Sequence, residues 1–246
     1  FTEDWTEDSE RRDFRLNAIY ADPDGTLFDP QDGIADAEAG RIVFIGDAEA
    51  RIREDYLRIL RFFRFRAWYG KGEPDAVALA ACRAHVKGMR GLSAERVWKE
   101  LKKLLGAPDP VDALEAMAVS EVSEVVIPEV IALDLIRALV ALEGREGWRP
   151  DPMLRLAALA PRFELNAMKF KKRFKLSNAE ADRISAWARL DFNPRLLVGA
   201  PEAELAGMLY PLDRQAVLDR ARLGWAIDAA KDEADAEAWR ALVTFA

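Results

Sequence analysis

Hydrophobic residues recur every three or four positions along most of the chain, which is the pattern of helices that bury one side. In residues 51–65, Leu57, Leu60 and Phe63 follow three-residue steps and predict one continuous helix. Turn and cap signals divide the chain after residue 48 into further amphipathic segments. We expect helices near residues 75–86, 93–105, 111–119, 131–143 and 151–160, and one more after a Ser177–Glu180 capping box.

Residues 19–46 carry a different pattern. Two short segments flank the turn Pro23-Asp24-Gly25 and predict a hairpin. Residues 41–45 are β-branched and aromatic, and they predict a further β segment. Asp22 and Asp24 have the spacing of a metal-binding pair, but the turn explains both aspartates. The sequence therefore predicts a mainly α fold with a small β part at the N-terminus.

Composition excludes several classes of protein. The 246 residues carry a net charge of −7, which argues against a protein that coats nucleic acid indiscriminately. A single cysteine excludes an internal disulfide, and one cysteine with one histidine excludes the usual zinc sites. No apolar run is long enough to span a membrane, and no signal peptide is visible. We therefore expect a cytoplasmic protein without a membrane partner.

Arginines follow the apolar residues of the 51–65 stretch. Arg58, Arg61 and Arg64 form a slanted ridge, and Asp55 precedes Arg58 by about one helical turn. The arginines of this stretch outnumber its acids, and arginine is suited to two-pronged recognition of phosphates and base edges. The alternative is a solvated helix whose charges form ion pairs.

A second polar cluster lies near the N-terminus. One helical turn would place Asp13 and Asn17 on one face, with Arg12 alongside. Together they offer acceptors, an amide and a cation, the set needed to hold a ribose hydroxyl and a phosphate. The alternative is an ion-pair cluster on the surface.

A third candidate is the segment 168–175, which alternates basic residues with methionine and phenylalanine and contains no acid. Clustered basic residues are typical of contacts with the phosphate backbone of nucleic acid. The alternative is a solvated, lysine-rich face. The candidate RNA-binding residues are Lys169, Lys171, Lys172, Arg173 and Lys175.

Three motifs carry a resemblance to a known family. Residues 54–58 read E-D-Y-L-R and continue as I-L-R-F-F-R-F, and residues 11–18 read R-R-D-F-R-L-N-A. The stretch from Leu92 reads L-S-A-E-R-V-W-K-E-L. In this order they resemble the motifs of class II tRNA nucleotidyltransferases, the family of CCA-adding enzymes and bacterial poly(A) polymerases. The second motif departs from the family at Arg15, where threonine is usual.

The resemblance implies an elongated arrangement of head, neck, body and tail, and an enzyme that uses Mg²⁺ to add nucleotides from CTP or ATP to an RNA 3′ end. By position, residues 1–46 would be a remnant of the head, 47–107 the helical neck that selects the nucleotide and binds RNA, and 108–246 the RNA-binding body and tail. Asp55 and Arg58 would pair with the base edge. The other nucleotide-binding residues would be Arg61, Arg64 and Arg12 at the triphosphate, and Asp13 and Asn17 near the ribose.

One departure from the family is large. Its G-S-x-x-R loop and its D-x-D pair precede the R-R-D motif, and this chain has too few residues there to contain them. The chain, which does not begin with methionine, is therefore interpreted as the latter part of a nucleotidyltransferase, with neither catalytic residues nor metal ligands. We expect it to bind CTP, ATP and tRNA or another RNA 3′ end, but not DNA, and to be inactive alone. The competing hypothesis is a non-catalytic helical domain that binds RNA or serves as a scaffold. CCA addition, A addition and poly(A) synthesis share these motifs.

Overall fold

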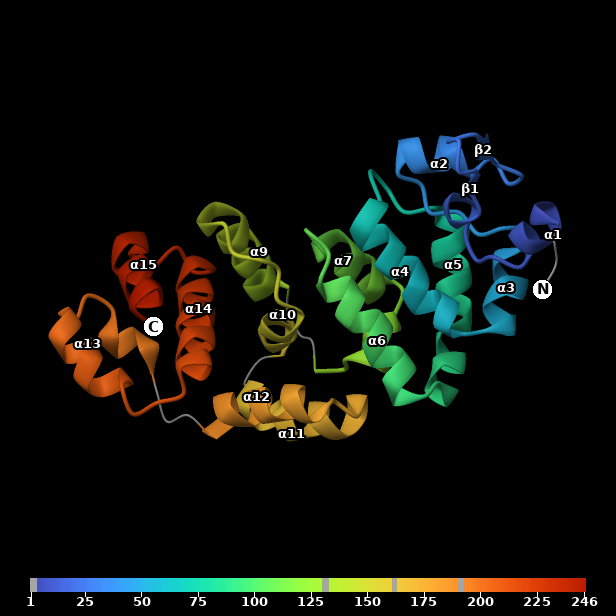
Figure 1. Ribbon diagram of the computed structural model, residues 1–246. Coiled ribbons are helices and arrows are strands. Elements are labelled where there is room, and N and C mark those ends of the chain that lie inside the picture. The colour runs from blue at the N-terminus through green and yellow to red at the C-terminus, as the bar shows by residue number, and fades with distance from the viewer. Residues whose placement is uncertain (1–3, 130–132, 161–162, 190–192) are drawn as a thin grey trace. The chain divides into compact units, whose positions relative to one another are not determined.

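The computed structural model describes residues 4–129, 133–160, 163–189 and 193–246. Within these ranges the chain is mainly helical, and its two strands form one small sheet (Figure 1). The mainly α prediction is confirmed. The chain folds into two compact units, one up to Pro128 and one from Glu129 onward. The expected division at residues 46 and 107 and the elongated arrangement of the parts stay predictions.

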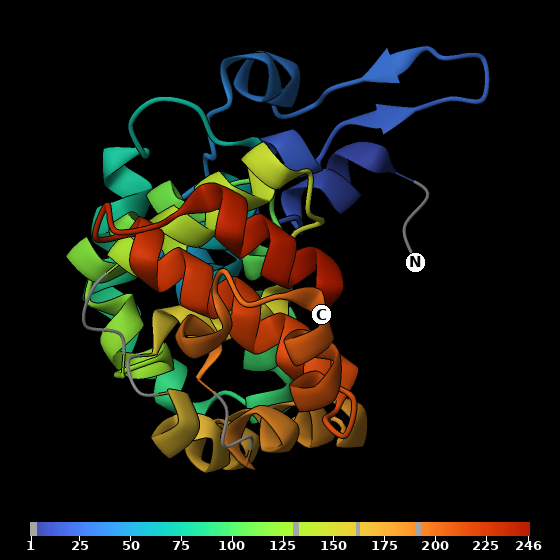
Figure 2. The same ribbon diagram turned by 90° about the vertical axis from the view of Figure 1, so that its left-hand side faces the viewer.

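The first unit begins with the short helix α1 (Trp5–Glu10), which Asp4 caps by accepting from two backbone N–H groups. Strands β1 (Tyr20–Ala21) and β2 (Leu27–Phe28) pair antiparallel and confirm the predicted hairpin (Figure 2). Asp24 is a turn former, because its Oδ1 accepts from the N–H of Thr26 at 2.9 Å. This use of the side chain supports the turn interpretation of Asp22 and Asp24.

Two local predictions for residues 19–46 are wrong. Residues 41–45 form no strand, and Phe44 makes only an isolated bridge to Phe14. Helix α2 (Gly33–Ala39) occupies part of the region read as β. Its first turn is stabilised by Asp29, whose two carboxylate oxygens accept from the N–H groups of Gly33 and Ile34 at 2.7 and 2.8 Å. An aspartate four residues before the helix was the missed signal.

Helices form the remainder of the first unit, and α4 lies at its centre. Helix α4 packs against both α6 and α7. Four of its apolar side chains, Ile59, Leu60, Phe62 and Phe63, are completely buried, which explains the apolar repeat in the sequence. The elements are α3 (Ala48–Glu54), α4 (Leu57–Tyr69), α5 (Ala76–His85), the 3₁₀ helix η2 (Val86–Gly91), α6 (Ala94–Leu105), α7 (Val111–Val119) and α8 (Val122–Val126).

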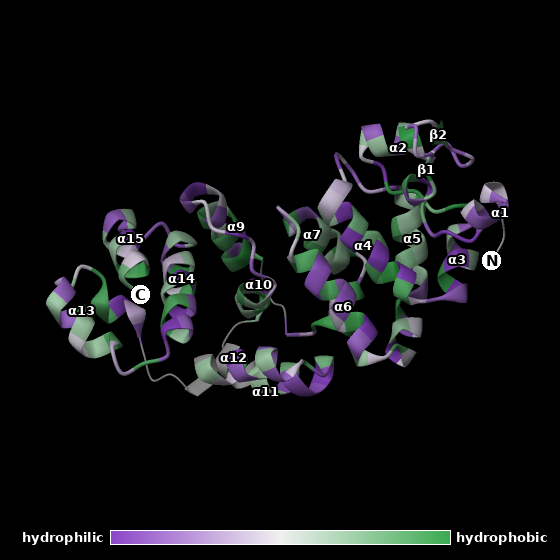
Figure 3. Ribbon diagram, viewed as in Figure 1, coloured by the Kyte–Doolittle hydropathy of each residue, from purple (hydrophilic) through white to green (hydrophobic). Residues whose placement is uncertain are grey.

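The second unit is built around α14, which packs against α9, α12 and α15. Its core is mostly apolar but also buries the charged side chains of Glu143, Arg155 and Asp219. Figure 3 shows hydrophobic and hydrophilic residues mixed along each of its helices. The capping box is confirmed, because Ser177 N donates to Glu180 Oε2 at 2.9 Å. The elements are α9 (Asp134–Glu146), α10 (Pro152–Leu159), α11 (Phe163–Phe174), α12 (Asn178–Arg189), the 3₁₀ helix η3 (Pro194–Leu197), α13 (Glu202–Leu209), α14 (Arg214–Ala229) and α15 (Ala236–Phe245).

Candidate functional site

The stretch 51–65 is not one helix, contrary to the prediction. Helix α3 ends at Glu54, Asp55 has extended backbone angles, and α4 begins at Leu57. The break is stabilised by Asp55, because its Oδ1 accepts from the N–H of Leu57 at 3.1 Å and its carbonyl accepts from the N–H of Arg58. Tyr56 packs so closely on Gly88 that a Cβ at position 88 would overlap its ring.

This break gives Asp55 and Arg58 different partners, although the sequence suggested that they interact with each other. Asp55 Oδ2 accepts from Arg96 Nη2 at 2.6 Å, across to helix α6. Arg58 turns back to α3, where its Nη1 donates to the carbonyl of Arg51 at 2.7 Å and forms an ion pair with Glu54. The Arg58 side chain is 15% exposed and the Asp55 side chain 35%, so both can still be reached from solvent.

Asp13 and Arg61 bring together the two motifs that were predicted to bind the nucleotide. Their side chains form an ion pair between residues that are 48 positions apart in the sequence. The helical turn expected at Asp13 is wrong, because only residues 15–17 form a 3₁₀ helix, but Asn17 Nδ2 still donates to Asp13 Oδ1 at 2.9 Å. Burial by itself raises the pKa of Asp13, and the hydrogen bond and charge of Arg61 outweigh it, so the net pKa is lowered.

Arg12 reaches the same region through its backbone. Its carbonyl accepts from the guanidinium of Arg51, so helix α3 is tied to the loop that contains Asp13. The Arg12 side chain itself pairs with Asp8, with Nη2 2.7 Å from Oδ2, and lies over the ring of Tyr20. Hydrogen bonds from Arg12 and Tyr20 lower the pKa of Asp8. Arg12 is thus near the candidate site, but its charge already has a partner.

Arg64 is paired with an acid that the sequence did not indicate. Its Nε lies 2.7 Å from Oε2 of Glu100 on α6, as an ion pair without hydrogen-bond alignment. The guanidinium also lies over the ring of Phe65, 4.4 Å from its centroid. Glu100 is 5% exposed and sits on the apolar face of α6 between Trp98 and Leu101. A charged residue on the buried face of a helix needs a partner, which is the signal that could have found this pair.

The excess of arginine over acid therefore exists only when residues 51–65 are counted by themselves. Distant carboxylates complete the balance, because Asp13 pairs with Arg61 and Glu100 with Arg64. The resulting cluster pairs guanidinium groups with carboxylates from other segments of the chain, and the carboxylates of Asp13 and Glu100 are buried. Such an arrangement offers donors and acceptors side by side, which matches the mixed edges of cytosine and adenine. A phosphate bound here has to compete with these carboxylates for the arginines.

The basic segment on α11 and directly after it presents its lysines outward. Phe170 and Phe174 are buried and stack on each other with centroids 5.9 Å apart, so they belong to the core and do not face a ligand. Arg173 forms an ion pair with Glu129. The exposed basic residues are Lys169, Lys171, Lys172 and Lys175.

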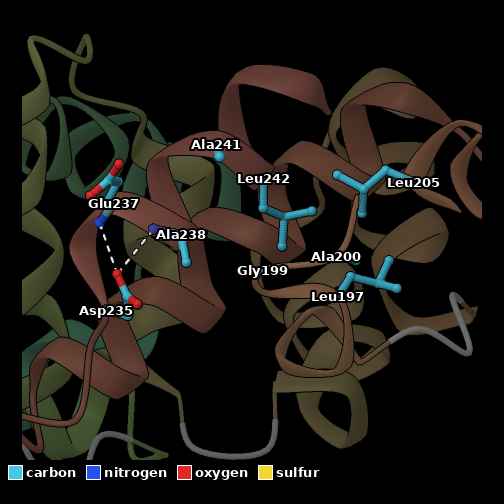
Figure 4. Close-up of a pocket in the computed structure, with 9 residues that line it drawn as sticks. All are labelled: Leu197, Gly199, Ala200, Leu205, Asp235, Glu237, Ala238, Ala241 and Leu242. Carbon is cyan, nitrogen blue, oxygen red and sulfur yellow. Dashed lines mark hydrogen bonds between the residues drawn. The ribbon is translucent and has the colours of Figure 1, made fainter. Parts of the chain in front are cut away.

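The second unit also contains two surface cavities. One has a volume of about 340 Å³ and lies between η3, α13 and α15 (Figure 4). Its polar end is closed by Asp235, which caps α15 by accepting from the N–H groups of Glu237 and Ala238. The other, of about 390 Å³, is lined by residues of α13, α14 and the C-terminal residues. None of the predicted site residues lines either cavity.

Metal ligands are not gathered anywhere in the described part of the chain. The described residues contain no group of three or more His, Cys, Asp and Glu side chains that could hold a metal ion. The Mg²⁺ implied by the resemblance therefore has no fitting ligand set among them. In the same part of the chain no helix has the length and apolar character needed to cross a membrane.

Two family models match the sequence. Residues 1–43 match the model described as "Poly A polymerase head domain", and residues 73–133 match "Probable RNA and SrmB- binding site of polymerase A". The second match covers α5 to α8, including the helix that carries Arg96 and Glu100.

Named relatives agree with these models. The chain is 38% identical over 187 residues to the mitochondrial CCA tRNA nucleotidyltransferase 1 of Mus musculus, covering 73% of this chain and 42% of the relative. It is 38% identical over 117 residues to the CCA-adding enzyme of Streptococcus pyogenes, covering 48% of this chain and 29% of the relative. A crystal structure of the Bacillus stearothermophilus CCA-adding enzyme in complex with CTP has a TM-score of 0.66 at 26% identity, covering 100% of this chain and 60% of that one. The chain spans less than two thirds of each of these proteins.

Proposed function

The chain belongs to the family of tRNA nucleotidyltransferases and poly(A) polymerases, and from this premise we propose that it forms the nucleotide-selecting and RNA-binding part of an enzyme that extends RNA 3′ ends. The observation that carries the proposal is the Asp13–Arg61 ion pair, which joins the R-R-D motif to α4, the helix that contains Arg58 of E-D-x-x-R. The relatives named above are CCA-adding, so tRNA is the proposed RNA and CTP and ATP are the proposed nucleotides.

The proposed roles are those that the family resemblance implies for these positions. Asp55 and Arg58 read the base edge, since one only accepts and the other only donates hydrogen bonds. For this, Arg58 exchanges Glu54 for the base, which the exposed position of Glu54 allows. Arg61, Arg64 and Arg12 hold the triphosphate, and Asp13 and Asn17 lie near the ribose.

The lysines of the α11 segment are proposed to contact the RNA backbone. Lys169, Lys171, Lys172 and Lys175 are exposed, and a phosphate backbone is the polyanion that such a row of cations attracts. Arg173 contributes less, because Glu129 already neutralises it.

None of these residues is proposed to take part in catalysis. The resemblance implies Mg²⁺ held by carboxylates, and the described residues do not fit that role. We therefore expect this chain to bind nucleotides without transferring them. A cytoplasmic location also stays a prediction, because the mouse relative is named a mitochondrial protein.

The proposal is tested by measuring which nucleotides the chain prefers. CTP, ATP, UTP and GTP are titrated into the chain by calorimetry, with Arg58→Ala as the variant and Arg53→Ala as the control, since Arg53 is an exposed arginine of α3 that pairs with Glu49. We expect CTP and ATP to bind more tightly than UTP and GTP. Arg58→Ala should reduce this discrimination by about 1–3 kcal/mol, the usual value of one good two-pronged base contact.

Two results contradict the proposal. If the unaltered chain shows no preference among the four nucleotides, it does not select a base. If Arg58→Ala weakens all four nucleotides equally, Arg58 contacts only phosphate and the non-catalytic RNA-binding or scaffold domain is favoured. Incorporation of CTP or ATP into tRNA lacking its 3′ end would contradict the expectation that the chain is inactive alone.

A further inference from the structure

Glu54, the last residue of α3, is shared by two arginines. Arg51 Nη1 donates to both carboxylate oxygens of Glu54, at 3.1 and 2.8 Å, and Arg58 Nη1 forms a second ion pair with Oε2. The hydrogen bond from Arg58 and the charges of both arginines lower the pKa of Glu54, so this side chain is a carboxylate at neutral pH. One acid therefore contacts two cations, of which Arg58 is the one with a proposed role at the nucleotide.

Arg51 is also held from outside α3. Its Nη2 donates to the carbonyl of Arg12, which lies 39 positions earlier in the sequence and next to Asp13. The Arg51 side chain is 13% exposed, whereas that of Glu54 is 51% exposed. Its bonds to Glu54 and to the Arg12 carbonyl do not involve the side chain of Arg58. Both bonds can therefore persist when Arg58 leaves Glu54.

Glu54 competes with a base for Arg58. The proposed function requires Arg58 to leave this carboxylate, which would then be unpaired if Arg51 were absent and would repel the negative charges of a nucleotide triphosphate. With Arg51 present, Glu54 keeps a partner on both of its oxygens. A carboxylate shared between two cations also binds each of them less firmly than it would bind one alone, because the cations repel each other. Arg51 thus makes it easier for Arg58 to exchange Glu54 for a base.

We propose that Arg51 is a positioning residue for nucleotide selection, which neutralises Glu54 and so releases Arg58 for the base edge. Arg51 acts through Glu54 and does not itself contact the nucleotide. This assignment rests on the proposed function, in which Arg58 reads the base. The competing role of Arg51 is purely structural, as a tie between α3 and the loop that contains Arg12.

The proposal is tested by titrating CTP, ATP, UTP and GTP into Arg51→Gln and into Arg51→Gln/Glu54→Gln by calorimetry. Glutamine at position 51 removes the cation but keeps an N–H donor. In the single variant Glu54 holds Arg58 more tightly, so the preference for CTP and ATP over UTP and GTP should fall by about 2- to 5-fold, a range typical of an exposed ion pair. In the double variant the competing carboxylate is gone, and the preference should return at least to that of the unaltered chain.

Two further variants serve as matched comparisons. Arg51→Lys keeps the cation and should retain most of the preference, although lysine lacks the planar fork of arginine. Arg53→Gln makes the same change at an exposed arginine of α3 that pairs with Glu49, and it should leave the preference unchanged. If Arg51→Gln does not fold, Arg51→Lys is compared with Arg51→Lys/Glu54→Gln, and the second substitution should again raise the preference.

The proposal is overturned if the folded Arg51→Gln variant keeps the full preference, or if adding Glu54→Gln to the variant at position 51 leaves a reduced preference unchanged. The latter result assigns Arg51 to the structural tie, since removing a carboxylate cannot replace the bond to the Arg12 carbonyl. Failure here is distinguishable from failure of the proposed function. An unaltered chain that prefers CTP and ATP but ignores substitution of Arg51 loses only this positioning role, whereas an unaltered chain without any preference loses both.

Discussion

Asp55 uses one carboxylate for two structural contacts and is proposed to make a third. Oδ1 accepts from the N–H of Leu57 and begins α4, while Oδ2 accepts from Arg96 and attaches the break to α6. A carboxylate has about four lone-pair sites, so these bonds leave capacity for a base edge. The same contacts that interrupt the helix therefore orient the group proposed to read the nucleotide.

Substitutions at Asp55 separate these roles. Asp55→Ala removes the hydrogen bond that the Asp55 side chain accepts from the first N–H of α4, and should destabilise the first unit by about 1 kcal/mol. Asp55→Asn keeps an oxygen that can accept from the N–H of Leu57, so it should cost less stability. It replaces the carboxylate that contacts Arg96, and that is proposed to contact the base, with an amide. We expect urea unfolding to distinguish the two variants and nucleotide titration to show altered preference in both. Equal destabilisation by the two variants would show that this hydrogen bond contributes little.

Among the elements of the second unit, α9 and α15 are joined by charge. Glu146 at the end of α9 accepts two hydrogen bonds from Arg240 of α15, at 2.8 and 2.9 Å, and one from Arg145. These arginines, Arg240 foremost, lower the pKa of Glu146 to about 2. A two-pronged arginine–carboxylate pair fixes both distance and angle between its helices.

This shift predicts a pH dependence with a definite sign. Because the folded state lowers the pKa of Glu146 from 4.5, its carboxylate stabilises the fold above about pH 4.5, and this stability is lost as the pH falls toward 2. Glu146→Gln should therefore be less stable than the unaltered chain at pH 7, and the difference should vanish near pH 2. Urea midpoints measured across this range test it, with the exposed Asp182→Asn as control. A difference that persists at pH 2 would assign the effect to packing.

On the scale of the whole molecule, the chain forms two units with separate cores. The first is centred on α4 and the second on α14. Each core contains completely buried leucines, such as Leu101 in the first unit and Leu139 in the second. Unfolding of two such units need not be one cooperative transition.

We expect two transitions in urea that respond to different substitutions. Leu101→Ala should lower the stability of the first unit by about 2–5 kcal/mol, and Leu139→Ala should do the same to the second, because each leaves a cavity in one core. Circular dichroism at increasing urea follows both transitions. A single transition that shifts equally with either substitution would show that the units unfold together.

The sequence by itself predicted most of the helices after residue 57, the Ser177–Glu180 capping box, the hairpin and the resemblance to the family. These features depend on contacts between residues a few positions apart, such as Ser177 with Glu180 or Asp24 with Thr26, or on motifs of contiguous residues. Even so, the rule that a periodic apolar pattern predicts a continuous helix failed at Asp55. There the side chain of Asp55 bonds the N–H of Leu57, and the helix is interrupted.

Only the tertiary structure decided which charges meet. Arg61 pairs with an aspartate 48 positions away and Asp55 with an arginine 41 positions away, so local counting made the arginines look unpaired. The same packing buried Phe170 and Phe174 beneath the α11 lysines and left Trp68 exposed beside those of α6. The physical reason is that spacing along a helix sets which side chains share a face, whereas the partner of that face depends on how distant helices pack.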